Sequence, residues 1–158
     1  WDITYWRNRI MRGIRGFEEF IEQNIIKKQS PDYSRAEFLI KESENSYNNL
    51  LELINKVKLE DYNANMFVKQ CYDILMELVR AIMLLQGYNA SGSGAHEAEV
   101  SYLRKLNFSE KEIQFADQLR YFRNGMIYYG TMLDKNYAEE VITFTKRVYS
   151  KLKEKCIK

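Results

Sequence analysis

The sequence contains few of the residues that build metal centres and disulfide frameworks. It has two cysteines and one histidine among 158 residues. Cys71 and Cys156 do not make a disulfide framework. Together with His96 they are too few to supply the four ligands of a structural zinc site. We therefore expect neither a metal nor a cofactor.

Proline and glycine are also scarce, and long apolar runs are absent. One Pro, seven Gly and 46% hydrophobic residues, without long alternating β-branched stretches, predict an all-α fold. No apolar run approaches the roughly 18 to 20 residues of a membrane span. No stretch has the charged, apolar and small-residue order of a signal peptide. The expected protein is soluble and cytoplasmic, with no membrane partner.

Charge is distributed unevenly, although the formal net charge is only +2. Residues 1–16 carry four arginines against one aspartate, and residues 146–158 carry six Lys or Arg against one glutamate, so the middle of the chain is acidic. If the two basic ends lie together, they form an electrostatic footprint for phosphate. The alternative is a pair of ordinary solvated helix faces.

Helical spacing of apolar residues predicts one domain over residues 1–158. Residues 1–29 form an N-terminal extension, a helix from Ile3 to about Lys28, and residues 34–155 form the bundle. The bundle helices are expected at about Ser34–Val57, Asn63–Gln86, Ala95–Leu106, Ser109–Leu133 and from the N-cap Asp134 to Lys155. We expect an up-and-down antiparallel bundle of four to five long helices plus a short one.

Three features set the connections and the centre of this bundle. Ser30-Pro31-Asp32 interrupts the helical pattern, because proline cannot continue a helix ladder. The polar stretch Gly87–Gly94 is expected to be a flexible linker, since it lacks the Gly-Lys-Ser/Thr ending of a phosphate-binding loop. The helix at residues 63–86 is apolar nearly all round, which predicts either the centre of the bundle or burial by a second subunit.

The helix at Ser109–Leu133 has two different faces. Ser109 and Glu112 have the spacing of a capping box. One face is an apolar stripe made of Phe115, Leu119, Phe122, Met126, Tyr129 and Leu133. The other face is a row of Arg120, Arg123, Asn124, Ile127, Tyr128 and Thr131.

The polar row is open to two interpretations. It is either an ordinary exposed face or a surface on which something packs. Ile127 and the glycines at 125 and 130 favour packing, because a glycine lets another backbone or a ligand approach; Gly130 alternatively ends the helix. We place Ile127 and Thr131 in a dimer interface on this hypothesis.

These residues resemble a known family. The order of a helix containing small residues, an apolar helix, a Gly-rich loop opening on an Ala-His-Glu helix, and then LRYFRNGMIYYG resembles the HEPN superfamily (higher eukaryotes and prokaryotes nucleotide-binding) over about residues 34–155. The family motif is an Arg followed by a polar residue, with a His about five positions after the Arg. It falls on Arg123, Asn124 and Tyr128. The resemblance implies a homodimer whose motifs face each other across a cleft and cleave RNA without metal.

The chain departs from that motif where proton transfer takes place. Arg123 can clamp a phosphate, with Arg120 adding charge one turn earlier. The unperturbed pKa of histidine is about 6.5, whereas that of tyrosine is about 10, so Tyr128 is a weak base near neutral pH. His96 is the histidine available as a substitute, but the first turn of a helix is more typical of a packing or capping role.

Two classes of function follow, and the resemblance suggests a partner for both. In the first, the protein binds RNA, a nucleotide or a protein partner through Arg120, Arg123, Asn124 and Tyr128, with little or no catalysis. In the second, it is a metal-independent, toxin-like ribonuclease that uses Arg123, Asn124 and Tyr128. The resemblance implies a minimal nucleotidyltransferase as partner in either case. We favour the first class, because a fold does not carry function when its site has changed; a structural dimer is a third reading.

Overall fold

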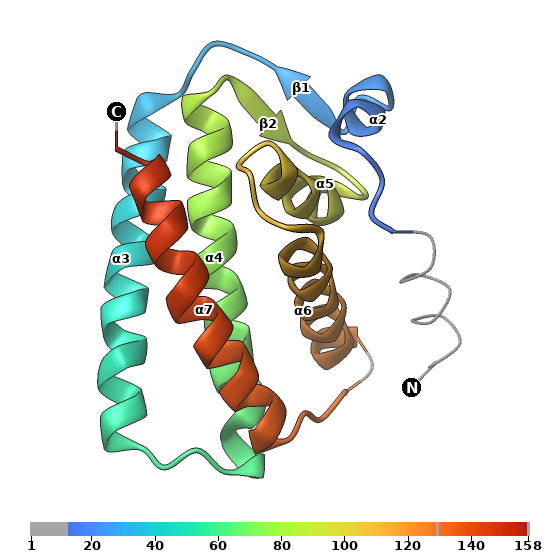
Figure 1. Ribbon diagram of the computed structural model, residues 1–158. Coiled ribbons are helices and arrows are strands. Elements are labelled where there is room, and N and C mark those ends of the chain that lie inside the picture. The colour runs from blue at the N-terminus through green and yellow to red at the C-terminus, as the bar shows by residue number, and fades with distance from the viewer. Residues whose placement is uncertain (1–12, 129, 158) are drawn as a thin grey trace.

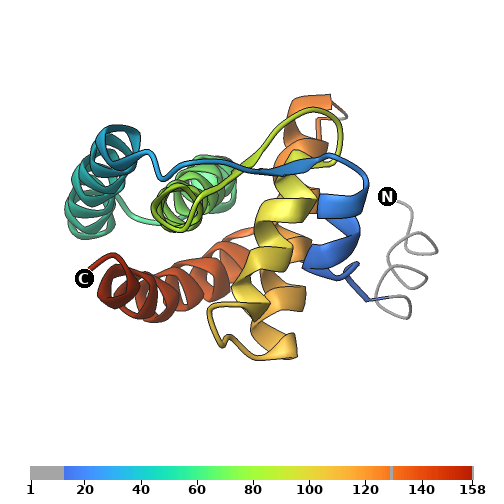
Figure 2. The same ribbon diagram turned by 90° about the horizontal axis from the view of Figure 1, so that it is seen from above.

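The computed structural model describes residues 13–128 and 130–157, with the side chains of Ile127 and Tyr128 outside the description. Its fold is an all-α bundle in which four long helices alternate in direction, as expected (Figure 1). Seen from above, α3, α4 and α7 lie on one side, and α2, α5 and α6 gather on the other (Figure 2). The four long helices are α3 (Tyr33–Lys56), α4 (Ala64–Leu85), α6 (Glu110–Tyr128) and α7 (Lys135–Lys155).

Helices α3 and α4 form an antiparallel hairpin within one residue of the expected bounds. Asp32 caps α3 by accepting a hydrogen bond from the backbone N–H of Arg35 at 3.0 Å. A short 3-10 turn, η1 (Asp61–Asn63), leads into α4. Two small side chains on α3, Ala36 and Ser43, are fully buried. Ser43 Oγ also donates to the carbonyl of Ile74 at 2.8 Å, so the two helices pack closely.

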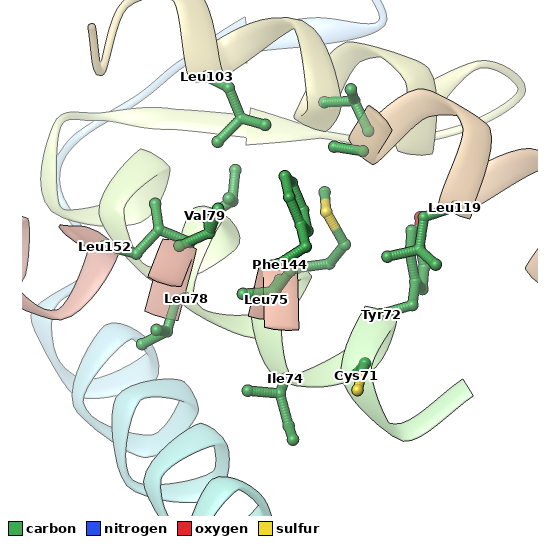
Figure 3. Packing of buried hydrophobic residues seen from close by; sticks show 14 of the residues in the cluster. Cys71, Tyr72, Ile74, Leu75, Leu78, Val79, Leu103, Leu119, Phe144 and Leu152 are labelled. Atoms are coloured by element: carbon green, nitrogen blue, oxygen red, sulfur yellow. The ribbon is translucent and has the colours of Figure 1, made fainter. Parts of the chain in front are cut away.

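Helix α4 is the centre of the bundle, which confirms the first of the two expectations for this apolar helix. It packs against α3 on one side and α7 on another, and its side chains are buried along most of its length. Leu75, Leu78 and Val79 lie in the core together with Phe144 and Leu152 of α7 (Figure 3). None of the helices among the described residues is both long and apolar enough to cross a bilayer.

Capping side chains fix the starts of α6 and α7 at the places the sequence predicts. Glu112 N–H donates to Ser109 Oγ at 3.1 Å, and Ser109 N–H donates to the Glu112 carboxylate at 3.2 Å. Asp134 accepts from the backbone N–H of Tyr137 at 2.8 Å at the start of α7. The short helix between α4 and α6 consists of α5 (Ala95–Ser101) and the 3-10 turn η2 (Tyr102–Arg104).

The expected first helix, Ile3 to about Lys28, is wrong over its described part. Residues 13–16 are not helical, α2 spans only Phe17–Glu22, and β1 follows at Ile26–Lys28. Gly13 has a φ of +66° and Asn24 a φ of +59°, a backbone conformation that a helix does not contain. Residues 1–12 lie outside the described residues.

The expected linker Gly87–Gly94 is partly a strand. Strand β2 (Tyr88–Ala90) pairs antiparallel with β1, so that Ile26 lies opposite Ala90 and Lys28 opposite Tyr88. Gly87 is required at the start, because its φ is +82° and a Cβ there would lie 2.6 Å from the carbonyl oxygen of Gln29. The ribbon therefore ties the segment before α3 to the segment after α4.

Helix α6 ends earlier than the expected Leu133. It stops at Tyr128, and Gly130, with a φ of +65°, follows outside the helix, which agrees with the helix-end reading of this glycine. The segment then turns back toward α4. Asn65 Nδ2 donates to the carbonyl of Thr131 at 2.8 Å, and Leu133 N–H donates to Asn65 Oδ1 at 2.9 Å. One side chain thus holds the connection between α6 and α7.

We expect Asn65→Ala to lower the free energy of unfolding by about 1 to 3 kcal/mol, because it removes the partners of two backbone groups at once. Urea denaturation followed by circular dichroism measures the change. Asn48→Ala, at an exposed position on α3, is the matched control and should change stability by less than about 0.5 kcal/mol. Equal effects of the two substitutions would show that the hydrogen bonds of Asn65 to Thr131 and Leu133 do not stabilise the fold.

Candidate functional site

Polar side chains from α4, α5 and α6 gather around one buried phenol, and we call this region the α4–α6 surface. The charges of Arg80, Glu99, Arg120 and Arg123 all act on the hydroxyl of Tyr72. The surface consists of Tyr72, Asp73, Glu77 and Arg80 on α4, His96 and Glu99 on α5, and Asp117, Arg120, Arg123 and Asn124 on α6. Its α6 residues include the first part of the predicted polar row.

Arg123, the predicted phosphate ligand, is only loosely engaged. Its Nη2 lies 3.6 Å from Asp73 Oδ1, beyond hydrogen-bonding distance. The Arg123 side chain is 29% exposed and that of Asp73 is 50% exposed, so the pair is open to water. The Arg123 guanidinium also lies 5.8 Å from the centre of the Tyr72 ring. The outer edge of this cation therefore remains accessible to a ligand.

Arg120, the second predicted ligand, is held by its own helix. Its Nε donates to Asp117 Oδ1 at 2.8 Å, and the two side chains are 13% and 3% exposed. A short, charge-assisted bond to a buried carboxylate leaves little of this cation for a ligand. The spacing of three residues between Asp117 and Arg120 is a sequence signal that predicts the pair.

Arg80 and Glu99 form a second closed pair, which the sequence did not reveal. Arg80 donates from Nε and Nη2 to the two carboxylate oxygens of Glu99, at 2.6 and 3.3 Å. Glu99 is 3% exposed. His96 Nδ1 lies 3.2 Å from the same carboxylate, and its side chain is 55% exposed. His96 thus stands beside the Arg80–Glu99 ion pair, and within the described part of the chain no hydrogen bond or ion pair joins it to Arg123.

Tyr72 is buried in the middle of these charges. The residue is 5% exposed, and its hydroxyl has no hydrogen-bond partner among the described residues. Burial, and secondly the Glu99 carboxylate, raise the pKa of the Tyr72 phenol far above its usual value; the arginines at 120, 80 and 123 oppose this. The phenol therefore stays protonated and remains a hydrogen-bond donor at any physiological pH.

A hollow of about 450 Å³ adjoins the surface between α3 and α4. It is lined by Ser46, Met66, Lys69, Gln70, Asp73 and Glu77. Burial, and then the carboxylates of Asp73 and Glu42, raise the pKa of Glu77. Asp73 is shared by this hollow and by the contact with Arg123, so the two regions are continuous.

The remaining predicted residues are only partly placed. Asn124 is half-buried on α6 next to Arg123. Thr131 lies after the helix end, with its N–H donating to the carbonyl of Gly125 at 3.2 Å. A Cβ on Gly125 would lie 2.7 Å from Thr131 Oγ1, so the chain itself makes the close approach that this glycine permits. The side chains of Ile127 and Tyr128 lie outside the description, as does Tyr129.

The basic chain ends do not form a common patch in the described residues. The segment before α2 and the end of α7 lie on opposite sides of the molecule (Figure 1). Arg15 pairs with Glu97 at 3.1 Å, Lys151 with Glu112 at 3.3 Å and Lys153 with Glu44 at 3.2 Å. Arg7, Arg9 and Arg12 lie outside the described residues.

The thiols and carboxylates add no reactive centre. Burial raises the pKa of Cys71 to about 11, so the thiol stays protonated and is a poor nucleophile. The described residues contain no group of three or more His, Cys, Asp or Glu side chains positioned to hold a metal ion. The chemistry available on the α4–α6 surface is therefore that of guanidinium, phenol, carboxylate, imidazole and amide groups.

Comparison with known proteins adds no family to this geometry. No protein-family model matches the chain, and no curated protein matches its sequence. Inferences about function therefore depend on the residues of the α4–α6 surface.

Proposed function

We propose that the protein binds a phosphate-containing ligand, RNA or a nucleotide, through Arg123 on the α4–α6 surface, with little or no catalysis. The observation that carries the proposal is the different state of its three arginines. Arg80 and Arg120 make short hydrogen bonds to buried carboxylates, whereas the contact of Arg123 with a carboxylate is a 3.6 Å approach to the half-exposed Asp73. A phosphate offers a guanidinium the bidentate contact that Asp73 does not make.

The proposed assembly is a cytoplasmic homodimer that places two such surfaces across one cleft, with a minimal nucleotidyltransferase as partner. Support comes from the HEPN-like order of elements and from the position of Arg123 and Asn124 near the end of α6. Tyr128 stands at the family's histidine position, and tyrosine is a weak base near neutral pH. His96 contacts Glu99 and not Arg123 among the described residues. The absence of a suitable base beside Arg123 in these contacts favours binding over cleavage.

We expect Arg123→Ala to weaken binding of a short, mixed-sequence, single-stranded RNA about tenfold or more, as one charge-assisted phosphate contact contributes about 1.5 to 3 kcal/mol. Fluorescence anisotropy in EDTA at low salt measures the change. Arg147→Ala removes an exposed arginine of α7 and should change the affinity less than about twofold.

The same RNA, analysed on a denaturing gel after incubation, separates binding from cleavage. Cleavage by the wild-type protein that is lost in Arg123→Ala and weakened in Tyr128→Phe would replace the binding proposal by the ribonuclease. Binding that is equal in wild type and Arg123→Ala would overturn the placement of the ligand on this surface.

A further inference from the structure

Two buried donors on adjacent helices of the α4–α6 surface lack an acceptor. The Tyr72 hydroxyl on α4 and the Arg123 Nε on α6 are both inaccessible to solvent, and neither has a hydrogen-bond partner among the described residues. The two side chains are in contact, because the Arg123 guanidinium lies 5.8 Å from the centre of the Tyr72 ring. Two neighbouring side chains on adjacent helices therefore each carry a buried donor without an acceptor within the described part of the chain.

Such an arrangement is costly unless something occupies it. More than about 90% of buried polar groups in proteins have a partner, and each unsatisfied donor costs about 1 to 3 kcal/mol. Guanidinium nitrogens have no acceptor capacity, and the protonated phenol has one hydrogen to donate, so one acceptor can satisfy both groups. An oxygen with several lone pairs satisfies both groups.

Three cations lie near the Tyr72 hydroxyl. The guanidinium groups of Arg120, Arg80 and Arg123 favour negative charge there, whereas burial, which has the largest effect, and the Glu99 carboxylate oppose it. The Asp73 carboxylate contacts only the Nη2 end of Arg123, so it satisfies neither Nε nor the phenol. An anionic oxygen that reaches deeper than Asp73 is the complement to this site.

We propose that Tyr72 and Arg123 bind the same phosphate group of the ligand, with the Tyr72 hydroxyl and Arg123 Nε both donating to it, and that Asp73 competes with this phosphate for Arg123. This inference builds on the proposed function and names a further ligand-binding residue. The phosphate displaces the half-exposed Asp73 side chain from Arg123 and brings its oxygens to the two inner donors.

Tyr72→Phe is the decisive variant, because it removes one oxygen and keeps the ring beside Arg123. Affinity for the short RNA and for inorganic pyrophosphate should fall about tenfold or more, the value of one hydrogen bond to a charged group. The melting temperature of the free protein should stay unchanged or rise, since the substitution removes an unsatisfied hydroxyl. Tyr47→Phe, whose ring stacks on Tyr149 away from this surface, is the matched control and should leave both quantities unchanged.

Two further variants test the same phosphate contact without depending on the Tyr72→Phe substitution alone. Asp73→Asn should tighten pyrophosphate binding several-fold, because it removes the competing charge without removing a donor. Tyr72→Phe in the Arg123→Ala background should cost little more than Arg123→Ala alone, because two residues on one phosphate are coupled.

Each result decides the inference. Weakened binding in Arg123→Ala with unchanged binding in Tyr72→Phe would overturn the role of Tyr72 and leave the proposed function intact, with a buried water as the acceptor. Unchanged binding in both variants would overturn the proposed function itself. A lower melting temperature of Tyr72→Phe with unchanged binding would assign the hydroxyl a structural role only.

Discussion

Replacing Glu99 by alanine is expected to destabilise the protein by about 2 to 4 kcal/mol, because it leaves Arg80 partly buried without its counter-charge. Glu99 is 3% exposed and accepts two hydrogen bonds from Arg80, the shorter at 2.6 Å. The Arg80 side chain is 30% exposed, so water screens part of the loss and keeps the value below that of a fully buried pair. Urea denaturation measures the difference in free energy.

Two further variants show how much of this loss comes from the Arg80–Glu99 ion pair. Glu99→Gln keeps an acceptor for Arg80 and should recover about half of the loss. Glu37→Ala, at an exposed position on α3, should change stability by less than about 0.5 kcal/mol. A loss in Glu99→Ala no larger than in Glu37→Ala would show that the pair contributes nothing to the fold.

Leu78→Ala is expected to cost about 3 to 5 kcal/mol, because it creates a cavity in the centre of the bundle. Leu78 is 0% exposed and belongs to the main core cluster (Figure 3). Helices on two sides hold α4 in place, so the site has little freedom to collapse around the missing atoms. Thermal and urea denaturation of the variant measure the loss.

The matched control for Leu78 is Leu85 in the last turn of the same helix. Leu85 is half-buried, and Leu85→Ala should cost less than half as much, since fewer neighbours surround it. Equal losses at the two positions would mean that burial is uniform along α4 and that the helix is not organised around its middle.

Sequence periodicity predicted the long helices because each of them has a local cause. Helices α3, α4 and α7 agree with their expected bounds to within a residue, and Asp134 caps α7 as its position before an amphipathic stretch indicates. Apolar spacing and capping are properties of neighbouring residues, so a single sequence contains them. The same argument predicted that this helix is either central or buried by a second subunit, and α4 is central.

Strand pairing was missed because its cause is not local. The stretch around Ile26 has helical spacing, and its conversion to a strand depends on a partner beyond the whole α3–α4 hairpin. Gly13 and Gly87 adopt positive φ values, which glycine adopts more readily than other residues. The sequence alone does not indicate which of its glycines adopt them. The result is a short helix and a ribbon in place of one long helix and a loop.

In the candidate site, too, the features that were predicted have a local cause, and contacts between distant residues were not predicted. The position of Arg123 and Asn124 on one helix face followed from spacing. Arg120 was expected to add charge for a phosphate, and its pairing with Asp117 was missed although the two residues have the spacing of a helical ion pair. The contacts of Arg123 with Tyr72 and Asp73 join α6 to α4 across the fold. No spacing rule relates residues so far apart in the chain, so these partners emerge only from the tertiary structure.

The β1–β2 ribbon has a consequence for the Arg80–Glu99 ion pair of the α4–α6 surface. Only residues 91–94 separate β2 from α5, and the ribbon anchors their first end to β1. This short connection keeps α5 beside α4, so that the effective concentration of Glu99 near Arg80 is high. Formation of the ribbon already restricts the chain between the two residues, so less conformational entropy is lost when the ion pair forms. The short connection through residues 91–94 thereby lowers the loop-closure entropy that the chain loses when this charged contact between two helices forms.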